Sequence, residues 1–255
     1  MHLINKLYTS EFDFPVTSKS SSNYMIAAIP RSGSTYLALK LWQTGVLGAP
    51  MEYLNLPAIA KQLMPRLGFG VRDDWSLFEE KEIRDYWENV KRIRTSPNGV
   101  FGYKIFMKNI VDLMSIGSNL FELISPDYII YLTRNDDVGQ AISYSKALRT
   151  NVWFADTDNV PKVDYDYAHI EHCKHSLQKQ YEYWENMFSM AGIDIIRVSY
   201  EDLMSNENRV MDTILAEMQV RREESKVLSI PTINRQSDSI SSKWRDLYES
   251  DRLAI

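Results

Sequence analysis

The chain has 255 residues, a length that suits one large α/β domain, and its hydrophobic fraction of 44% and charged fraction of 25% are those of an ordinary globular protein. Its formal net charge of −5 argues against a broad surface for nucleic acid or an anionic membrane, because such surfaces need an excess of basic residues. A local pocket for a small anion stays compatible with this charge, since a few arginines and backbone N–H groups suffice to build one.

The number of cysteines and the hydrophobicity of the segments indicate in which cellular compartment the protein is expected. Cys173 is the only cysteine, so an intrachain disulfide is excluded and a reducing compartment is the simpler interpretation. No stretch approaches the roughly 20 apolar residues of a membrane span, and residues 1–22 lack the apolar segment of a signal peptide. We therefore expect a cytoplasmic protein with an N-terminal arm over residues 1–22 and one domain over residues 23–255.

The first predicted elements are a buried strand over residues 24–29, a polar loop over residues 31–35 and a helix that ends at Gly45. Gly33 lets the loop turn tightly and lets its backbone approach a ligand. The loop precedes the first helical turn, whose free N–H groups and positive dipole end attract anions. This strand–loop–helix segment therefore predicts an anion site, although an ordinary junction with capping serines has the same residue types.

The side chains of the loop fit an anion as well. They are Arg31, Ser32, Ser34 and Thr35. The guanidinium suits phosphate or sulfate oxygens and the hydroxyls add donors. The loop lacks the first glycine and the lysine of the nucleoside-triphosphatase motif G-x-x-x-x-G-K-[ST], and the dinucleotide motif G-x-G-x-x-G is absent too.

Further along the chain, strands alternate with helices. We expect partly helical structure over residues 56–70, a helix over 77–94, strands over 100–106, 127–132 and 193–198, and a long helix that ends at Gly192. Ser199 resembles a helix cap, and the segment from Pro231 onward is polar. The alternation predicts an α/β fold, with a central parallel sheet flanked by helices and ligands at the carboxyl ends of its strands.

An ordered set of motifs resembles one known family. Residues 30–37, PRSGSTYL, are similar to the 5′-phosphosulfate loop of sulfotransferases, and residues 44–53, TGVLGAPMEY, resemble the T-G-V-x-G-x-P-x-E-[FY] stretch of the bacterial trehalose 2-sulfotransferase family. The similarity extends from about residue 24 to residue 248. It includes the stretches 95–104, 132–143, 150–153, 198–203 and 235–244.

The resemblance implies a P-loop-like sulfotransferase fold and a function. The enzyme would move a sulfuryl group from 3′-phosphoadenosine 5′-phosphosulfate (PAPS) to a hydroxyl of a carbohydrate or glycolipid acceptor, and would release adenosine 3′,5′-bisphosphate. It implies no metal for the chemistry, no nucleic-acid partner, and a homodimer, because members of the family can be dimers. Residues 23–255 would then be the sulfotransferase domain.

The resemblance also assigns the 3′-phosphate of the nucleotide to Arg134 and Ser143, which follow the predicted strand 127–132. A guanidinium together with a hydroxyl suits a phosphate group. In many sulfotransferases the spacing between the two is one residue shorter. Alternatively, Arg134 pairs with Asp136 or Asp137, and Ser143 faces only polar surroundings.

Sulfuryl transfer also needs charge stabilisation and a base. Arg31 and the loop N–H groups suit the charge that develops on the departing phosphate oxygen. The family match makes Glu52 the general base that takes the proton of the acceptor hydroxyl. The alternative is an ordinary solvated loop carboxylate.

Further candidates follow from position in the predicted elements. Lys104, at the end of a strand, is expected to contact sulfate or acceptor, with an exposed lysine as the alternative. Tyr53 and Trp153 are candidates for stacking on a sugar ring, although Trp153 suits a core position equally well. Arg235 and Ser242 are expected to close over the 3′-phosphate or adenine unless the tail is a simple surface segment.

A dense group of potential ligands does not predict a metal site. It comprises His169, His172, Cys173 and His175. On a helix these side chains spread around the axis, and Cys173 falls on the apolar stripe. We therefore expect no metal here, and a small buried hydrophobe at Cys173.

Two other functions compete with sulfuryl transfer. A small-molecule kinase would need a nucleoside triphosphate and magnesium, and the missing lysine and metal-binding aspartate motif count against it. A non-catalytic nucleotide-binding protein would not need the full set of Arg31, Glu52 and Arg134, all of which are present.

Overall fold

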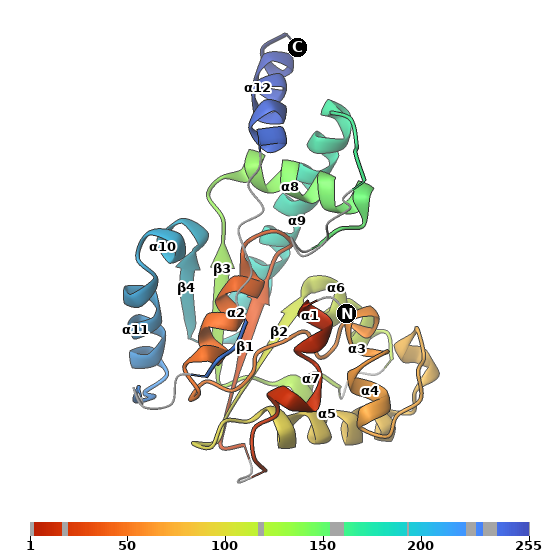
Figure 1. Cartoon of the computed structure of the whole chain (residues 1–255), viewed down its shortest axis with the longest axis vertical. Helices are drawn as coiled ribbons and strands as arrows, with labels where there is room; N and C mark the ends of the chain where they lie inside the picture. Colours follow the sequence, from red (N-terminus) through yellow and green to blue (C-terminus); the bar gives the residue numbers. More distant parts are fainter. Residues whose placement is uncertain are drawn as a thin grey trace.

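A central four-stranded parallel sheet, with strand order β2-β1-β3-β4, organises the computed structural model of the chain (Figure 1). The structure describes residues 3–16, 20–116, 120–153, 161–192, 194–222, 228–231 and 239–254. The strands are β1 (Ser22–Ala28), β2 (Val100–Phe106), β3 (Tyr128–Thr133) and β4 (Ile195–Ser199). These bounds confirm the predicted strands to within a few residues and confirm the predicted α/β fold class.

Helices cover both faces of the sheet, so the inner strands are apolar on both sides. One core cluster contains Tyr24 and Ile26 of β1 and the other contains the alternate residues Met25 and Ala27, as the two-residue period of a strand requires. The first cluster includes residues of α2 (Ser34–Gln43), α10 (Tyr200–Ser205) and α11 (Glu207–Glu217). The second includes residues of α5 (Glu80–Arg94), α6 (Met107–Met114), α8 (Asp137–Thr150) and α9 (Tyr167–Ala191).

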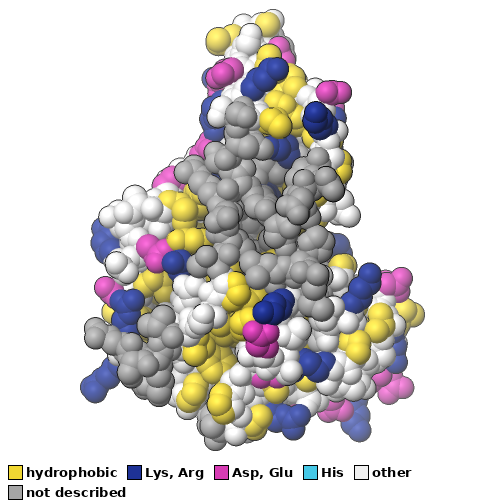
Figure 2. All heavy atoms as spheres, in the orientation of Figure 1, with side chains coloured by type: hydrophobic (Ala, Val, Ile, Leu, Met, Phe, Trp, Pro, Cys, Tyr) yellow, Lys and Arg dark blue, Asp and Glu magenta, His cyan; other side chains and the backbone are white. Residues whose placement is uncertain are grey.

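Shorter elements complete the fold. They are α1 (Leu3–Lys6), η1 (Ser10–Phe12), α3 (Leu56–Ile59), α4 (Leu63–Arg66), η2 (Trp75–Leu77) and α7 (Leu120–Ile124). Figure 2 shows that basic and acidic side chains intermix over the described parts of this face instead of separating into single-sign regions. Within the described ranges, no helix combines the length and the apolar character that crossing a membrane requires.

The order of the strands fixes where a ligand can bind. From β1 the chain moves to β2 on one side, and from β3 it moves to β4 on the other side. In an open parallel sheet the connections therefore diverge between β1 and β3, and a crevice opens at the carboxyl ends of these two strands. The loop at residues 30–33 follows β1 and Arg134 follows β3, so both predicted anion-binding segments lie at this crevice.

The C-terminal segment departs from the prediction of a polar tail. Residues Ser239–Ala254 form helix α12, which packs against α8 and projects beyond the sheet (Figure 1). Trp244 and Tyr248 are buried on its inner face, where their rings contact Tyr165 and Tyr167. Two aromatic residues one turn apart give too weak a periodic signal among polar neighbours to predict this helix.

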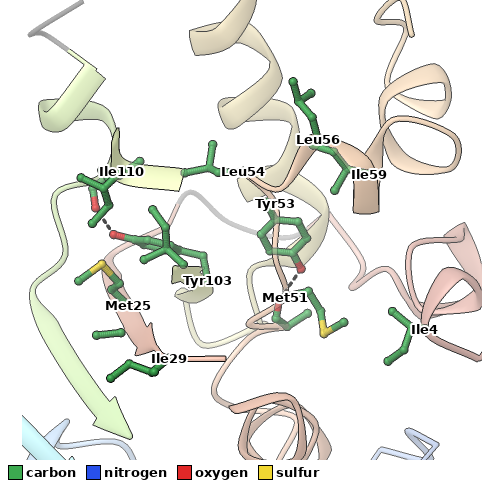
Figure 3. Close-up of a cluster of buried hydrophobic side chains, with 14 of the residues drawn as sticks. Ile4, Met25, Ile29, Met51, Tyr53, Leu54, Leu56, Ile59, Tyr103 and Ile110 are labelled. Atoms are coloured by element: carbon green, nitrogen blue, oxygen red, sulfur yellow. Dashed lines mark hydrogen bonds between the residues drawn. The ribbon is translucent and has the colours of Figure 1, made fainter. Parts of the chain in front are cut away.

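The N-terminal segment is part of the domain, so the prediction of a separate arm is wrong for residues 3–16. Leu7, Tyr8 and Phe14 are buried in the core, and Figure 3 shows Ile4 pointing from α1 toward the cluster that contains Met51. The polar run that suggested an arm includes residues 17–19, which lie outside the described residues.

An ion pair fastens this segment to α5. Asp13 accepts a bond of 2.5 Å from Nη1 of Arg66, and its other oxygen lies 3.3 Å from Nη2 of Arg94, a side chain with no exposed surface. Arg94 also donates to the carbonyls of Thr9 and Phe12, and its guanidinium lies over the Trp42 ring. Asp13 therefore neutralises a cation that has no access to water.

Asp13→Ala is expected to lower the free energy of unfolding by about 3 kcal/mol, because it leaves the buried Arg94 without a counter-charge. The matched control is Asp212→Ala, which removes the exposed partner of Arg222 and should cost less than about 1 kcal/mol. Urea unfolding of both variants measures the difference. Equal losses would contradict this account of the N-terminal segment.

Candidate functional site

A cavity of about 1170 Å³ opens at the carboxyl ends of β1 and β3. The loop after β1, the end of β3, the start of α10 and the described part of the C-terminal region line one part of it. Residues 51–58, α1 and α6 line another part. The predicted anion loop and the predicted base Glu52 thus face one continuous space.

The loop after β1 is built to present backbone donors. Gly33 has a φ of 89° and occupies the N-cap position of α2, where no side chain caps the helix. The first N–H groups of α2 therefore stay available to an anion. Arg31 also has a positive φ, 63°, which is a strained conformation for a residue with a side chain and is typical of functional loops.

Ser32 supplies independent evidence for a missing polar partner. Its side chain is fully buried, and its hydroxyl oxygen has no hydrogen-bond partner among the described residues. A buried hydroxyl left unpaired costs free energy, so such groups usually have a partner in the functional state. Ser32 is not among the residues that line the cavity, so its predicted contact with an anion stays a prediction.

Gly33 is required by its neighbour as well as by its backbone. A Cβ atom at this position would lie 2.5 Å from Cδ2 of Tyr200, the first residue of α10. Tyr200 also packs under the second anion-binding segment, since the Arg134 guanidinium lies 4.9 Å from its ring centroid. Tyr200 therefore contacts both anion-binding segments.

Arg31 and Arg134 converge at the mouth of the crevice. Nη1 of Arg134 donates to the Arg31 carbonyl over 3.2 Å, and Arg31 donates to the Ser143 hydroxyl over 2.9 Å and to the Trp153 carbonyl over 2.7 Å. Burial, assisted by the like charge of Arg134, lowers the pKa of Arg31 to about 10. Two neighbouring cations in a partly buried site favour binding of an anion.

A carboxylate balances part of this charge. Asp136 accepts a bond of 3.2 Å from Nη2 of Arg134 and a second bond from Arg245 of α12. Partial burial would raise the pKa of Asp136, but the bonds from Arg245 and the Gly139 N–H, with the charges of both arginines, hold it below its usual value. Arg134 therefore does pair with Asp136, as the alternative prediction states, and the Arg134 side chain also lines the cavity.

Hydrogen bonds join the two strand ends to each other. Gln140 donates to the Pro30 carbonyl over 2.8 Å and accepts from the Tyr181 hydroxyl over 2.9 Å. That hydroxyl accepts in turn from the Arg134 N–H over 3.0 Å. The loop after β1 and the end of β3 are thus held in a fixed relation by α8 and α9.

A buried lysine and an asparagine hold the Glu52 carboxylate. Lys104 is fully buried, and its Nζ lies 2.8 Å from Oε1 of Glu52 and 2.8 Å from the Thr35 hydroxyl. Asn55 donates to Oε2 of Glu52 over 2.6 Å. The alternative of an exposed Lys104 is therefore wrong: this lysine links the anion loop to the carboxylate.

The structure places only some of the other predicted site residues at the cavity. Trp153 and Ser242 line the cavity, and Trp153 is 36% exposed, so the core position considered for it is wrong. Arg235 lies outside the described residues. Ser143 contacts Arg31, and its predicted role toward a 3′-phosphate stays a prediction.

The prediction that Tyr53 stacks on a sugar is wrong for this structure. Its ring is fully buried and stacks on Phe101, and its hydroxyl donates to the Ala49 carbonyl. Figure 3 shows the ring inside the hydrophobic cluster. Glu52 lines the cavity, whereas Tyr53 lies in the turn that follows it and faces the core.

Three residues at the site were not predicted. Tyr200 lies within a stretch interpreted as a helix cap and as part of the family resemblance, with no role given to Tyr200 itself, and Ser199 does cap α10 by accepting the Asp202 N–H. Arg245 lies in the segment interpreted as a polar tail, and Asn55 lies in a loop without a recognised motif. The spacing of Asn55 three residues after Glu52 was the one available signal.

The histidine-rich stretch does not form a site in the described part of α9. Burial raises the pKa of the Cys173 thiol to about 11, and the residue packs in the core, as predicted. Among the described residues, no group of three or more His, Cys, Asp or Glu side chains is arranged to hold a metal ion.

Comparisons with known proteins extend over nearly the whole chain. The family model described as Stf0 sulphotransferase matches residues 23–251. The trehalose 2-sulfotransferase of Mycolicibacterium smegmatis is 31% identical over 258 residues, covering 89% of this chain and 94% of that protein. The trehalose 2-sulfotransferase of Mycobacterium tuberculosis is 27% identical over 269 residues, covering 93% and 99%. Among solved structures, the sulfotransferase domain of the Synechococcus PCC 7002 olefin synthase has a TM-score of 0.46 and 16% identity, covering 91% of this chain and 90% of that chain.

Gly33→Ala is expected to destabilise the protein more than Gly68→Ala does. The two glycines have almost the same φ, 89° and 86°, but a Cβ at Gly68 meets nothing within 4 Å. The backbone change alone should cost about 1–2 kcal/mol at either position, and the contact with Tyr200 should add about 1–3 kcal/mol at Gly33. Urea unfolding measures both losses, and adding Tyr200→Ala should recover the excess at Gly33. Identical losses for the two glycine variants would refute the packing role of Tyr200.

Proposed function

Because the chain belongs to the Stf0 sulphotransferase family and is therefore a sulfotransferase, we propose that it transfers a sulfuryl group from PAPS to a carbohydrate hydroxyl. One observation carries this proposal: the uncapped start of α2 and the guanidiniums of Arg31 and Arg134 converge on the same cavity as Glu52. The similarity to two trehalose 2-sulfotransferases supports a sugar as the acceptor.

The residues at the crevice fit the two anionic ends of PAPS. When bound, PAPS supplies a sulfuryl group attached to a phosphate that can leave. The loop N–H groups, the unpaired Ser32 hydroxyl, Ser34, Thr35 and Arg31 would hold the 5′-phosphosulfate. Gly33 keeps the backbone of this loop open to the ligand.

The 3′-phosphate would bind at the end of β3. Arg134 already faces the cavity, and Ser242 and Arg245 of α12 line the same part of it. Ser143 accepts a hydrogen bond from Arg31 but keeps its own hydroxyl hydrogen to donate. Asp136 would orient both Arg134 and Arg245 toward the phosphate through the bonds it accepts from them.

Lys104 and Glu52 would have different roles where the sulfuryl group is transferred. Lys104 places a buried positive charge beside Thr35 of the anion loop, where it would stabilise negative charge during transfer. Each oxygen of Glu52 accepts one hydrogen bond in this structure and keeps a lone pair free. Glu52 would take the proton of the acceptor hydroxyl as that oxygen bonds to sulfur and the phosphate oxygen departs with its electron pair.

Arg134→Ala should weaken binding of adenosine 3′,5′-bisphosphate by about tenfold or more, because a hydrogen bond to a charged group contributes about 1.5–3 kcal/mol. Adenosine 5′-phosphate, which lacks the 3′-phosphate, should lose much less affinity. Calorimetric titration measures both, and Arg197→Ala, which removes an exposed arginine paired with Glu185, is the control. A loss of the same size for both nucleotides would refute the 3′-phosphate site.

Glu52→Gln should reduce the rate of sulfate transfer by roughly 10²–10⁴-fold, the usual contribution of a general base. Affinity for adenosine 3′,5′-bisphosphate should be retained. Transfer from labelled PAPS to a panel of sugars measures the rate. Asn55→Ala, which keeps the carboxylate, should lose far less activity. Glu52→Gln leaves Lys104 without its carboxylate partner, so urea unfolding must show that this variant is folded at the assay temperature. A folded Glu52→Gln variant with full activity would remove Glu52 as the base.

A further inference from the structure

One part of the cavity that Glu52 lines has a row of apolar side chains on α6, beside polar ones. Met107 and Val111 of α6 line the cavity, and Met114 follows one turn later on the same helix. With 3.6 residues per turn, these three side chains fall within about 60° of arc, so they form a single stripe along α6. We call Met107, Val111 and Met114 the α6 stripe.

The outer part of the α6 stripe, Val111 and Met114, is separate from the core contacts of its helix. Ile110 and Leu113 are buried beneath α6, whereas Val111 is 57% and Met114 58% exposed, and Met107 is half-buried. Lys108 and Asp112 form an ion pair with each other on the flank of the helix. Met107 packs partly against the core, whereas the fold does not need Val111 and Met114 for its own core.

Neighbouring segments extend this row of apolar side chains. Pro57 and Ala58 of α3 and Ile4 of α1 line the same cavity as Met107 and Val111. Glu52 lines the same cavity and is held by Lys104 and Asn55. A ligand with its hydroxyl at Glu52 would thus have apolar side chains of α1, α3 and α6 along its outer portion.

Single exposed apolar residues are ordinary, but a contiguous apolar surface that continues an active-site cavity marks a binding site. Asn5 and Lys108 also line the cavity and can pair with hydroxyls, but hydroxyls of a free sugar that face the α6 stripe would be left unpaired. We infer that the natural acceptor is amphipathic, with a hydroxyl-bearing polar head at Glu52 and a hydrocarbon chain along the α6 stripe. This inference rests on the proposed function and narrows its acceptor class.

The length of the α6 stripe sets the expected length of the acceptor's hydrocarbon chain. From Met107 to Met114 the helix rises roughly 10 Å, which is about the length of an extended octyl chain. Each methylene group removed from water strengthens binding by up to about fourfold. Partial exposure of the bound chain lowers that limit, so about twofold to fourfold per methylene is the expected range.

The test compares methyl, butyl and octyl β-glucoside, all below their micelle concentrations, on protein loaded with adenosine 3′,5′-bisphosphate. Calorimetry should show a dissociation constant that falls about twofold to fourfold per methylene up to octyl, and kcat/KM for sulfate transfer from PAPS should rise in parallel. Equal dissociation constants for the three glycosides would overturn the inference.

Two matched valine variants locate the binding surface. Val111→Asp places a charge in the stripe, whereas Val71→Asp changes a valine that is 62% exposed and does not line the cavity. In Val111→Asp the preference for octyl over methyl glucoside should fall by at least about tenfold, and in Val71→Asp it should stay as in the unmodified protein. Urea unfolding checks that both variants fold.

The possible results distinguish a failure of the proposed function from a failure of the inferred amphipathic acceptor. If octyl glucoside binds through Val111 but no glycoside of any length is sulfated, the carbohydrate acceptor is wrong and the hydrocarbon site stands. If methyl glucoside is sulfated as well as octyl glucoside, the proposed function stands and the amphipathic acceptor is wrong. If Val111→Asp changes only the sedimentation mass, the α6 stripe is a contact between copies of this chain and the inference is wrong.

Discussion

The site depends on two guanidinium groups that the fold holds close together against their mutual repulsion. Arg31 and Arg134 follow β1 and β3, and the strand order β2-β1-β3-β4 makes these two strand ends neighbours at the point where the chain connections diverge. Asp136 offsets part of the positive charge, and the pKa of Arg31 remains lowered by burial and by Arg134. The hydrogen-bonded chain from Pro30 through Gln140 and Tyr181 keeps the segments from separating. The local excess of positive charge is therefore maintained by the fold, on a protein whose net charge is negative.

Lys104 connects this anion-binding region to the chemistry proposed at Glu52. A fully buried ammonium group is costly unless it is paired, and its partners here are the Glu52 carboxylate and the Thr35 hydroxyl. The pairing holds residues 51–55 against β2, where Met51 also forms a bridge with Tyr103. The carboxylate is thus placed by electrostatics from one side and by backbone pairing from the other. That arrangement explains how a residue in a loop can have a defined position relative to the start of α2.

The sequence predicted the strands, because each is a local apolar pattern, and it placed the loop after β1 and Arg134 at two neighbouring strand ends, because the ordered motifs follow those strands. It did not predict the contacts that depend on packing. Lys104 lies near the end of an apolar strand, but only the folded chain shows that its partner is Glu52. Tyr53 follows Glu52 and looked equally accessible, yet it faces the core. Arg245 reaches Asp136 from a helix about 110 residues later, and no spacing in the sequence indicates that bond.

A third strand end completes the site and ties it to the edge of the sheet. β4 pairs with β3 in a register that places Ser199 opposite Thr133, so Tyr200 and Glu201 begin α10 beside Arg134. Tyr200 packs against both Gly33 and Arg134, and Glu201 accepts the N–H groups of Asn135 and Asp136. A shift of this register by one residue would turn the Tyr200 ring to the other face and leave those N–H groups unpaired. The pairing of the edge strand β4 is therefore a requirement of the anion site as well as of the sheet, although β4 itself contributes no side chain to the cavity.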